Sequence, residues 1–99
     1  MPELKKYKMF IGGEWVDSDT KKTFETLNPE DNKPWAVVPE ASANDVDKAV
    51  KAAQKAFEGD WPKILPRERA KFLRAIGNKL RDNAELLGKV ETIDTGKLF

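Results

Sequence analysis

The spacing of apolar residues changes near Ser42, and this change divides the chain into two kinds of structure. Before Ser42, the segment 23–27 (TFETL) alternates polar and apolar residues as a half-buried strand does. After Ser42, one apolar stripe follows the helical repeat, made of Val46, Ala49, Val50, Ala53 and Phe57. Ser42 and Asp45 together match an N-terminal capping pattern. The sequence therefore predicts strands within residues 1–40 and helices within residues 42–96.

Within the first forty residues, turn signals separate four apolar segments. Residues 8–11 and 14–16 are joined by Gly12-Gly13, two residues that both tolerate the positive φ angles of a type I′ turn, which predicts a hairpin. The strand at 23–27 stops at Asn28-Pro29. Residues 34–39 (PWAVVP) form a further short apolar run, which predicts one more strand.

Two amphipathic helices are predicted after the strands. The first ends at Gly59, and the second begins at Pro66, whose fixed φ suits the first helical position. The predicted buried face of the second helix consists of Leu73, Ile76, Leu80, Ala84 and Leu87. Asp82-Asn83 predicts a kink or break, and Gly96 predicts the helix end. Taken alone, this order of strands and then helices is an α+β segment.

These predicted elements offer one another little cover. Each apolar helix stripe needs a sheet face or another helix beneath it, and a few short strands cannot supply both. We therefore expect some apolar faces of this 99-residue chain to pack against other polypeptide.

Composition excludes most kinds of active site. The sequence contains no cysteine and no histidine, which removes thiol nucleophiles, Ser/His/Asp triads and nearly all zinc sites. Eighteen basic and 17 acidic residues leave a net charge of +1, so we expect no nucleic-acid or membrane partner. The first residues lack the apolar core of a secretory signal, and we expect a cytoplasmic protein.

Five segments in order carry a family resemblance. They are residues 10–16 (FIGGEWV), Thr23-Phe24 with Asn28-Pro29, the helix at 45–57, Trp61 with Arg67 and Arg69, and residues 91–97 (ETIDTGK). Together they resemble the amino-terminal region of the NAD(P)-dependent aldehyde dehydrogenase superfamily over nearly the whole chain. Two positions depart from that pattern. Asn32 replaces a frequent glycine but tolerates left-handed backbone, so we expect the turn to be kept, and Leu98 replaces a proline.

The resemblance implies an α/β enzyme with a Rossmann-like cofactor domain, of which residues 1–99 form the amino-terminal part. Such an enzyme oxidises an aldehyde to a carboxylic acid with NAD or NADP through a cysteine thiohemiacetal and thioester, as a homodimer or homotetramer. No residue of this chain matches the family's catalytic or cofactor-binding motifs. We therefore expect a structural role, with no activity and no bound cofactor for these residues alone.

One family site falls within the chain. The resemblance implies a sodium or potassium ion held by the backbone carbonyls of Thr26 and Leu27 and by the carboxylate of Asp94. Such oxygen ligands suit a hard cation. The alternative for Asp94 is a helix-end aspartate that makes local hydrogen bonds.

Two alternatives to the enzyme segment remain open. The chain is then either a short non-catalytic module that pairs with a full-length subunit through its apolar stripes, or an independent α+β binding domain. The basic residues Arg67, Arg69, Lys71 and Arg74 indicate a solvated helix face or a contact with a neighbouring subunit.

Overall fold

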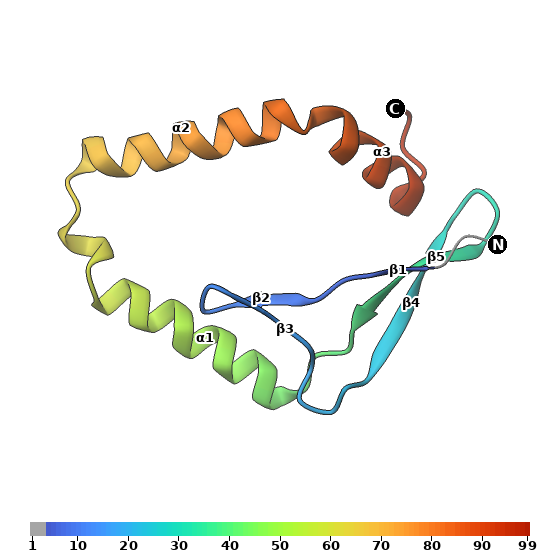
Figure 1. Ribbon diagram of the computed structural model, residues 1–99, viewed down its shortest axis with the longest axis horizontal. Coiled ribbons are helices and arrows are strands. Elements are labelled where there is room, and N and C mark those ends of the chain that lie inside the picture. Colours follow the sequence, from blue (N-terminus) through green and yellow to red (C-terminus); the bar gives the residue numbers. More distant parts are fainter. Residues whose placement is uncertain (1–3) are drawn as a thin grey trace.

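The computed structural model describes residues 4–99 as strands followed by helices (Figure 1). The strands are β1 (Lys5–Lys6), β2 (Met9–Ile11), β3 (Glu14–Val16), β4 (Thr23–Asn28) and β5 (Lys33–Pro39). The helices are α1 (Ala43–Glu58), the short 3₁₀ helix η1 (Trp61–Lys63), α2 (Pro66–Asp82) and α3 (Ala84–Thr95). The predicted α+β order is confirmed.

The strands form two small sheets. One is the predicted hairpin of β2 and β3, in which Phe10 pairs with Trp15 and both turn glycines have positive φ, 60° at Gly12 and 82° at Gly13. The other has the order β1-β5-β4, with β4 antiparallel and β1 parallel to β5. β1 was not predicted, because a two-residue parallel strand has no periodicity to detect.

The start of α1 follows the predicted capping pattern. The Ser42 hydroxyl accepts from the Asp45 N–H at 3.2 Å, and the Asp45 carboxylate accepts from the Ser42 N–H at 2.9 Å. This reciprocal arrangement satisfies donors that a helix N-terminus leaves free. The helix ends at Gly59, as predicted.

The predicted second helix is divided into α2 and α3. The break lies at Asn83, where a kink or break is predicted, and the Asn83 side-chain amide donates to the Lys79 carbonyl at 2.9 Å. The Asn83 backbone N–H donates to the same carbonyl at 3.1 Å, so both groups of Asn83 hold the last turn of α2. Gly96 closes α3 in a left-handed conformation, φ 78°, as predicted.

The predicted buried face of the second helix is not buried against any described residue. Leu73 is 70% exposed, Ile76 56% and Leu80 55%. The cause is that no strand or helix of residues 4–99 lies beneath this face of α2. Two of them, Ile76 and Leu80, border an apolar groove of about 470 Å³ between α2 and α3, together with Phe72, Leu86 and Leu87.

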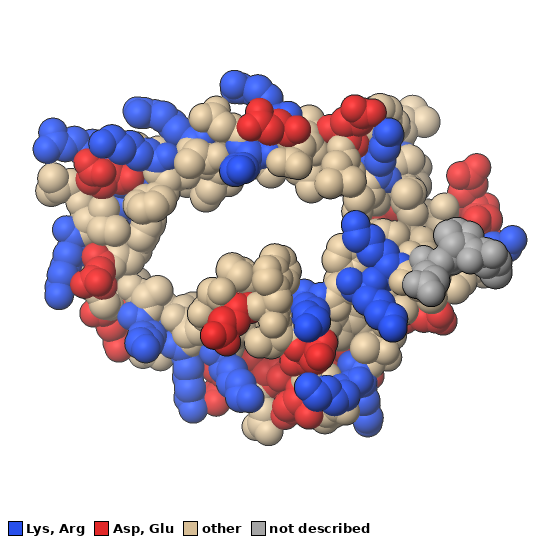
Figure 2. Space-filling model, viewed as in Figure 1, with Lys and Arg blue, Asp and Glu red and all other residues tan. Residues whose placement is uncertain are grey.

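The chain encloses an open centre instead of a core. Figure 1 shows the helices as an arc that leaves the strands at α1 and returns to them at α3, and Figure 2 shows the opening in the space-filling view. The radius of gyration is 17.1 Å, whereas about 13 Å is typical of 100 residues. The accessible surface is 8468 Å², against roughly 5,700 Å² for a compact chain of this mass. Ala36 is the one fully buried hydrophobic residue among those described.

Candidate functional site

The carboxylate of Asp94 joins the end of α3 to the sheet. One of its oxygens, Oδ1, accepts from the Thr26 hydroxyl at 2.6 Å and from the Trp35 indole N–H at 3.2 Å. The partners lie 68 and 59 residues away in the sequence, so these hydrogen bonds are long-range and fix tertiary structure.

A bulge in the sheet accounts for the position of Trp35. Thr26 pairs with Ala36, but Leu27 pairs with Pro34, so Trp35 is an extra residue on β5. A bulged residue is re-aimed relative to its neighbours. Here the indole is directed to Asp94 and packs edge-on against Tyr7, with ring centroids 6.2 Å apart.

The end of α3 is held beside the turn between β4 and β5. A Cβ at Gly96 would lie 3.2 Å from the Pro29 ring, closer than most such contacts, and the backbone there has a positive φ. Gly96 therefore permits both the end of the helix and its close approach to Pro29. This approach keeps Asp94, two residues earlier, within reach of β4.

A cavity of about 490 Å³ lies between the sheet and α3. Its walls are mainly aromatic and aliphatic, and they include Tyr7, Phe24, Trp35, Leu87 and Val90. Thr26 and Asp94 contribute polar groups to the lining. The cavity therefore combines an apolar wall with the carboxylates of Glu91 and Asp94.

The structure brings together two of the three residues of the predicted cation site. Thr26 and Asp94 are in direct contact, although through the Thr26 hydroxyl, and Leu27 follows Thr26 at the bulge in β4. Within the part of the chain that is described, no group of three or more His, Cys, Asp or Glu residues is arranged to hold a metal. The cation site stays a prediction.

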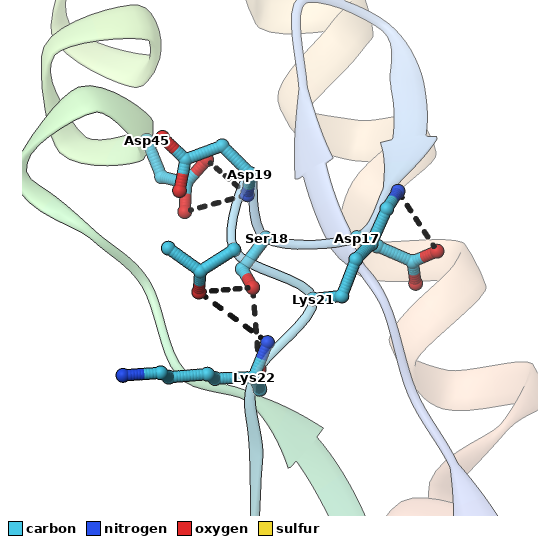
Figure 3. Close-up of polar contacts among 7 residues, drawn as sticks. Asp17, Ser18, Asp19, Lys21, Lys22 and Asp45 are labelled. Carbon is cyan, nitrogen blue, oxygen red and sulfur yellow. Dashed lines mark hydrogen bonds and ion pairs between the residues drawn. The ribbon is translucent and has the colours of Figure 1, made fainter.

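A second polar cluster, centred on Asp45, connects the loop after β3 to the start of α1 (Figure 3). Asp45 is only 4% exposed and Ser18 only 1%. The Asp45 carboxylate accepts from the Asp19 N–H at 3.2 and 3.3 Å, in addition to the N–H and hydroxyl of Ser42. The capping pattern identified Asp45 from the sequence, but its contact with Asp19 was missed, because nothing local specifies a partner 26 residues away.

Hydrogen bonds lower the pKa of Asp19 below its ordinary value of 3.8. The Ser42 hydroxyl is the main cause and the Asn44 side-chain amide the next, both favouring the ionised carboxylate. The Asn44 amide donates to Asp19 Oδ2 at 3.2 Å. Because Asp19 is exposed and its partners are neutral hydrogen-bond donors, this cluster organises a loop and offers no proton-transfer chemistry.

No helix in the described span 4–99 has the length and apolar character required to cross a membrane.

Comparisons with known proteins point to one family. Residues 15–99 match the model described as the aldehyde dehydrogenase family. Aldehyde dehydrogenase family 2 member C4 of Arabidopsis thaliana is 41% identical over 100 residues, which are 100% of this chain and 20% of that protein. The chain thus spans about a fifth of the length of this relative.

Solved structures agree with the sequence comparison. The NAD-dependent aldehyde dehydrogenase from Sinorhizobium meliloti superimposes with a TM-score of 0.91 at 33% identity, covering 96% of this chain and 19% of that one. An NAD+ complex of aldehyde dehydrogenase from Bacillus cereus gives a TM-score of 0.87 at 42% identity, covering 91% and 18%. The open arrangement of strands and helices is therefore one found inside a larger fold. The chain belongs to the aldehyde dehydrogenase family.

Proposed function

We propose that this chain is the amino-terminal segment of a longer NAD(P)-dependent aldehyde dehydrogenase subunit, in which it is scaffold and not catalyst. The observation that carries the proposal is the coverage: relatives match nearly all of this chain but only about a fifth of their own length. The large accessible surface of 8468 Å² supports it, because the chain leaves its apolar faces uncovered.

The complete subunit oxidises an aldehyde to a carboxylic acid. In the mechanism that we propose for it, a cysteine attacks the aldehyde carbon, and loss of hydride from the resulting thiohemiacetal leaves a thioester that water hydrolyses. The cysteine lies outside residues 1–99, which contain none. Bound NAD or NADP supplies the hydride acceptor.

Residues 4–99 do not fit a nicotinamide cofactor. A dinucleotide site needs a glycine-rich turn that opens a helix, so that backbone N–H groups meet the phosphates. Gly12-Gly13 instead forms the turn of the β2–β3 hairpin, and at the start of α1 the Asp45 N–H donates to the Ser42 hydroxyl. The cofactor therefore belongs to the remainder of the subunit.

Residues 4–99 hold the helices α1 and α3 in place on the strands. The Asp94 hydrogen bonds attach α3 to the sheet, and the Asp45 hydrogen bonds attach α1 to the loop after β3. Between those two attachments, the apolar faces of α1 and α2 are presented to the rest of the subunit. Val50 and Phe57 on α1 are 57% and 73% exposed, comparable with the face of α2.

A monovalent cation at Asp94 is part of the proposal. The carbonyls of Thr26 and Leu27 and the Asp94 carboxylate are hard oxygen donors, which fit sodium or potassium. The test is the thermal midpoint of the complete subunit in sodium, potassium or choline chloride at equal ionic strength. We expect a rise with one metal cation that Asp94→Asn removes and the matched change Asp82→Asn does not. Equal midpoints in all three salts would contradict the site.

We further propose that the subunit is cytoplasmic and assembles as a homodimer or homotetramer. Cell fractionation and light scattering of the purified protein measure these two properties directly. A membrane-bound fraction or a monomeric mass would overturn them.

The decisive experiment for the function compares two purified proteins in an aldehyde-dependent NADH or NADPH assay. The product of the reading frame extended past codon 99 is expected to be active, and the 99-residue chain inactive. Activity of the 99-residue chain would overturn the proposal.

The alternative function is a short module that pairs with a full-length subunit, and the exposed apolar groove between α2 and α3 favours it. The two functions differ in the gene. A natural stop codon directly after codon 99 supports the module and contradicts the enzyme segment.

A further inference from the structure

All four arginines of the sequence lie on α2, at positions 67, 69, 74 and 81. The five ion pairs of the described chain are all made by lysines, and four of them join residues three or four apart in sequence. Within residues 4–99, no arginine nitrogen lies within 4.0 Å of a carboxylate oxygen. Their guanidinium N–H groups are therefore not used in ion pairs within these residues. Such groups can donate two hydrogen bonds to one carboxylate.

Three of these arginines form one row. Arg67, Arg74 and Arg81 are exposed and recur at every seventh residue of α2, which places them on one side of the helix at intervals of about 10.5 Å. Arg69 is separate, because the helical repeat places it on the apolar side. We call Arg67, Arg74 and Arg81 the arginine row.

The arginine row lies opposite the apolar face of α2. By the helical repeat, Leu73, Ile76 and Leu80 point away from it. Figure 2 shows the same division, with Lys and Arg side chains projecting outward over α2 and mostly uncharged atoms around the opening. The arginine row is thus on a different side of α2 from the apolar face that we expect further polypeptide to cover.

The charge of α2 differs from that of the rest of the chain. The helix carries six basic and two acidic residues, a net charge of +4, while the whole chain has +1. The other residues therefore have a net charge of −3. The ion pairs of the described residues are all made by lysines, so no such pair offsets the three positive charges of the arginine row.

We propose that the arginine row is a docking site for an acidic helix of a protein partner, with carboxylates at every seventh residue. When two helices lie side by side, carboxylates at every seventh residue of one line up with arginines at every seventh residue of the other. Each arginine then pairs with one carboxylate. A nucleic acid fits less well, because the chain as a whole is nearly neutral and the one aromatic residue of α2, Phe72, lies on the other side of the helix from the arginine row, in the groove with α3.

The test uses the complete polypeptide that contains this segment and two synthetic helical peptides of equal composition. One peptide carries three glutamates at every seventh position, and the other has the same glutamates on different faces. Binding is measured by fluorescence anisotropy at low and at physiological salt. The variant is Arg67→Gln/Arg74→Gln/Arg81→Gln, and its matched control, Lys48→Gln/Lys51→Gln/Lys55→Gln, removes the same charge from α1.

We expect the in-register peptide to bind about tenfold more tightly than the other, the sum of three exposed ion pairs. The arginine variant should lose this difference, and the lysine control should keep it. The proposal would be overturned if the two peptides bound equally, or if both variants lost the preference for the in-register peptide to the same extent. Tighter binding of a single-stranded RNA of similar length would also overturn it. Circular dichroism of both variants confirms unchanged folding, and aldehyde oxidation tests the proposed function separately.

Discussion

The Thr26 hydroxyl donates to Asp94 Oδ1 at 2.6 Å and so connects β4 to the last turn of α3. Trp35 donates to the same oxygen from the bulge in β5. These two bonds close the arc of helices onto the sheet, and a bond to a charged acceptor is stronger than one between neutral groups. The Asp94 carboxylate therefore connects α3 to both β4 and β5.

Replacing Asp94 by alanine should release the end of α3. Loss of two hydrogen bonds to a carboxylate costs about 2 kcal/mol, which raises hydrogen exchange of the α3 amides roughly 30-fold in the complete polypeptide. Asp82→Ala is the matched control, because Asp82 is an exposed aspartate at the end of α2. Equal exchange in the two variants would show that Asp94 does not hold α3.

Asp45 and Asp47 should respond very differently to substitution by alanine. Asp45 is buried and accepts from Ser42 and Asp19, so its loss leaves backbone donors unpaired and costs about 2 kcal/mol. Asp47 forms one exposed ion pair with Lys51, at 2.9 Å, worth about 0.3 kcal/mol. Exchange rates of the first α1 amides measure both effects. Similar rates in the two variants would contradict the role of Asp45.

Alanine substitutions at two glycines should have opposite signs. At Gly96 the positive φ and the 3.2 Å approach to Pro29 make a Cβ unfavourable by about 1 kcal/mol or more. At Gly77, inside α2, a Cβ meets nothing within 4 Å, and alanine gains roughly 0.5–1 kcal/mol of helix propensity. The thermal midpoint should fall for Gly96→Ala and rise for Gly77→Ala. Two changes of the same sign would contradict the description of Gly77 in α2 or that of Gly96 at the end of α3.

The carboxyl of Asp19 should titrate below pH 3.8, because its pKa is lowered by the Ser42 hydroxyl first and the Asn44 amide second. A group with a lowered folded-state pKa contributes stability above its unfolded pKa and loses that contribution as pH falls through the folded value. The loss at Asp19 is therefore confined to strongly acidic pH. Carboxyl ¹³C titration by NMR should show a larger upward pKa change in Ser42→Ala than in Asn44→Ala. The reverse order would contradict the assignment.

Local features of this fold were predictable from the sequence, and non-local ones were not. Gly12-Gly13, the Ser42–Asp45 cap and the break at Asn83 each depend on residues that are neighbours in the chain, so their patterns are visible in the sequence. β1 and the bulge at Trp35 depend on how distant strands pair. The apolar faces were correctly identified, but a helical repeat cannot specify what covers them.

The candidate site shows the same limit. The resemblance selected Thr26 and Asp94, and the structure brings their side chains into contact. The resemblance could not reveal that Trp35 also donates to the Asp94 carboxylate, because the indole reaches Asp94 only through the extra residue in β5.

The central claim is that the apolar faces around the open centre are made to be covered by further polypeptide. The most direct measurement is calorimetry of the isolated 99-residue chain together with its radius of gyration in solution. The account predicts no sharp unfolding transition and an expanded or self-associating chain. A single cooperative transition in a monomer with a radius of gyration near the ~13 Å of a compact domain would contradict it.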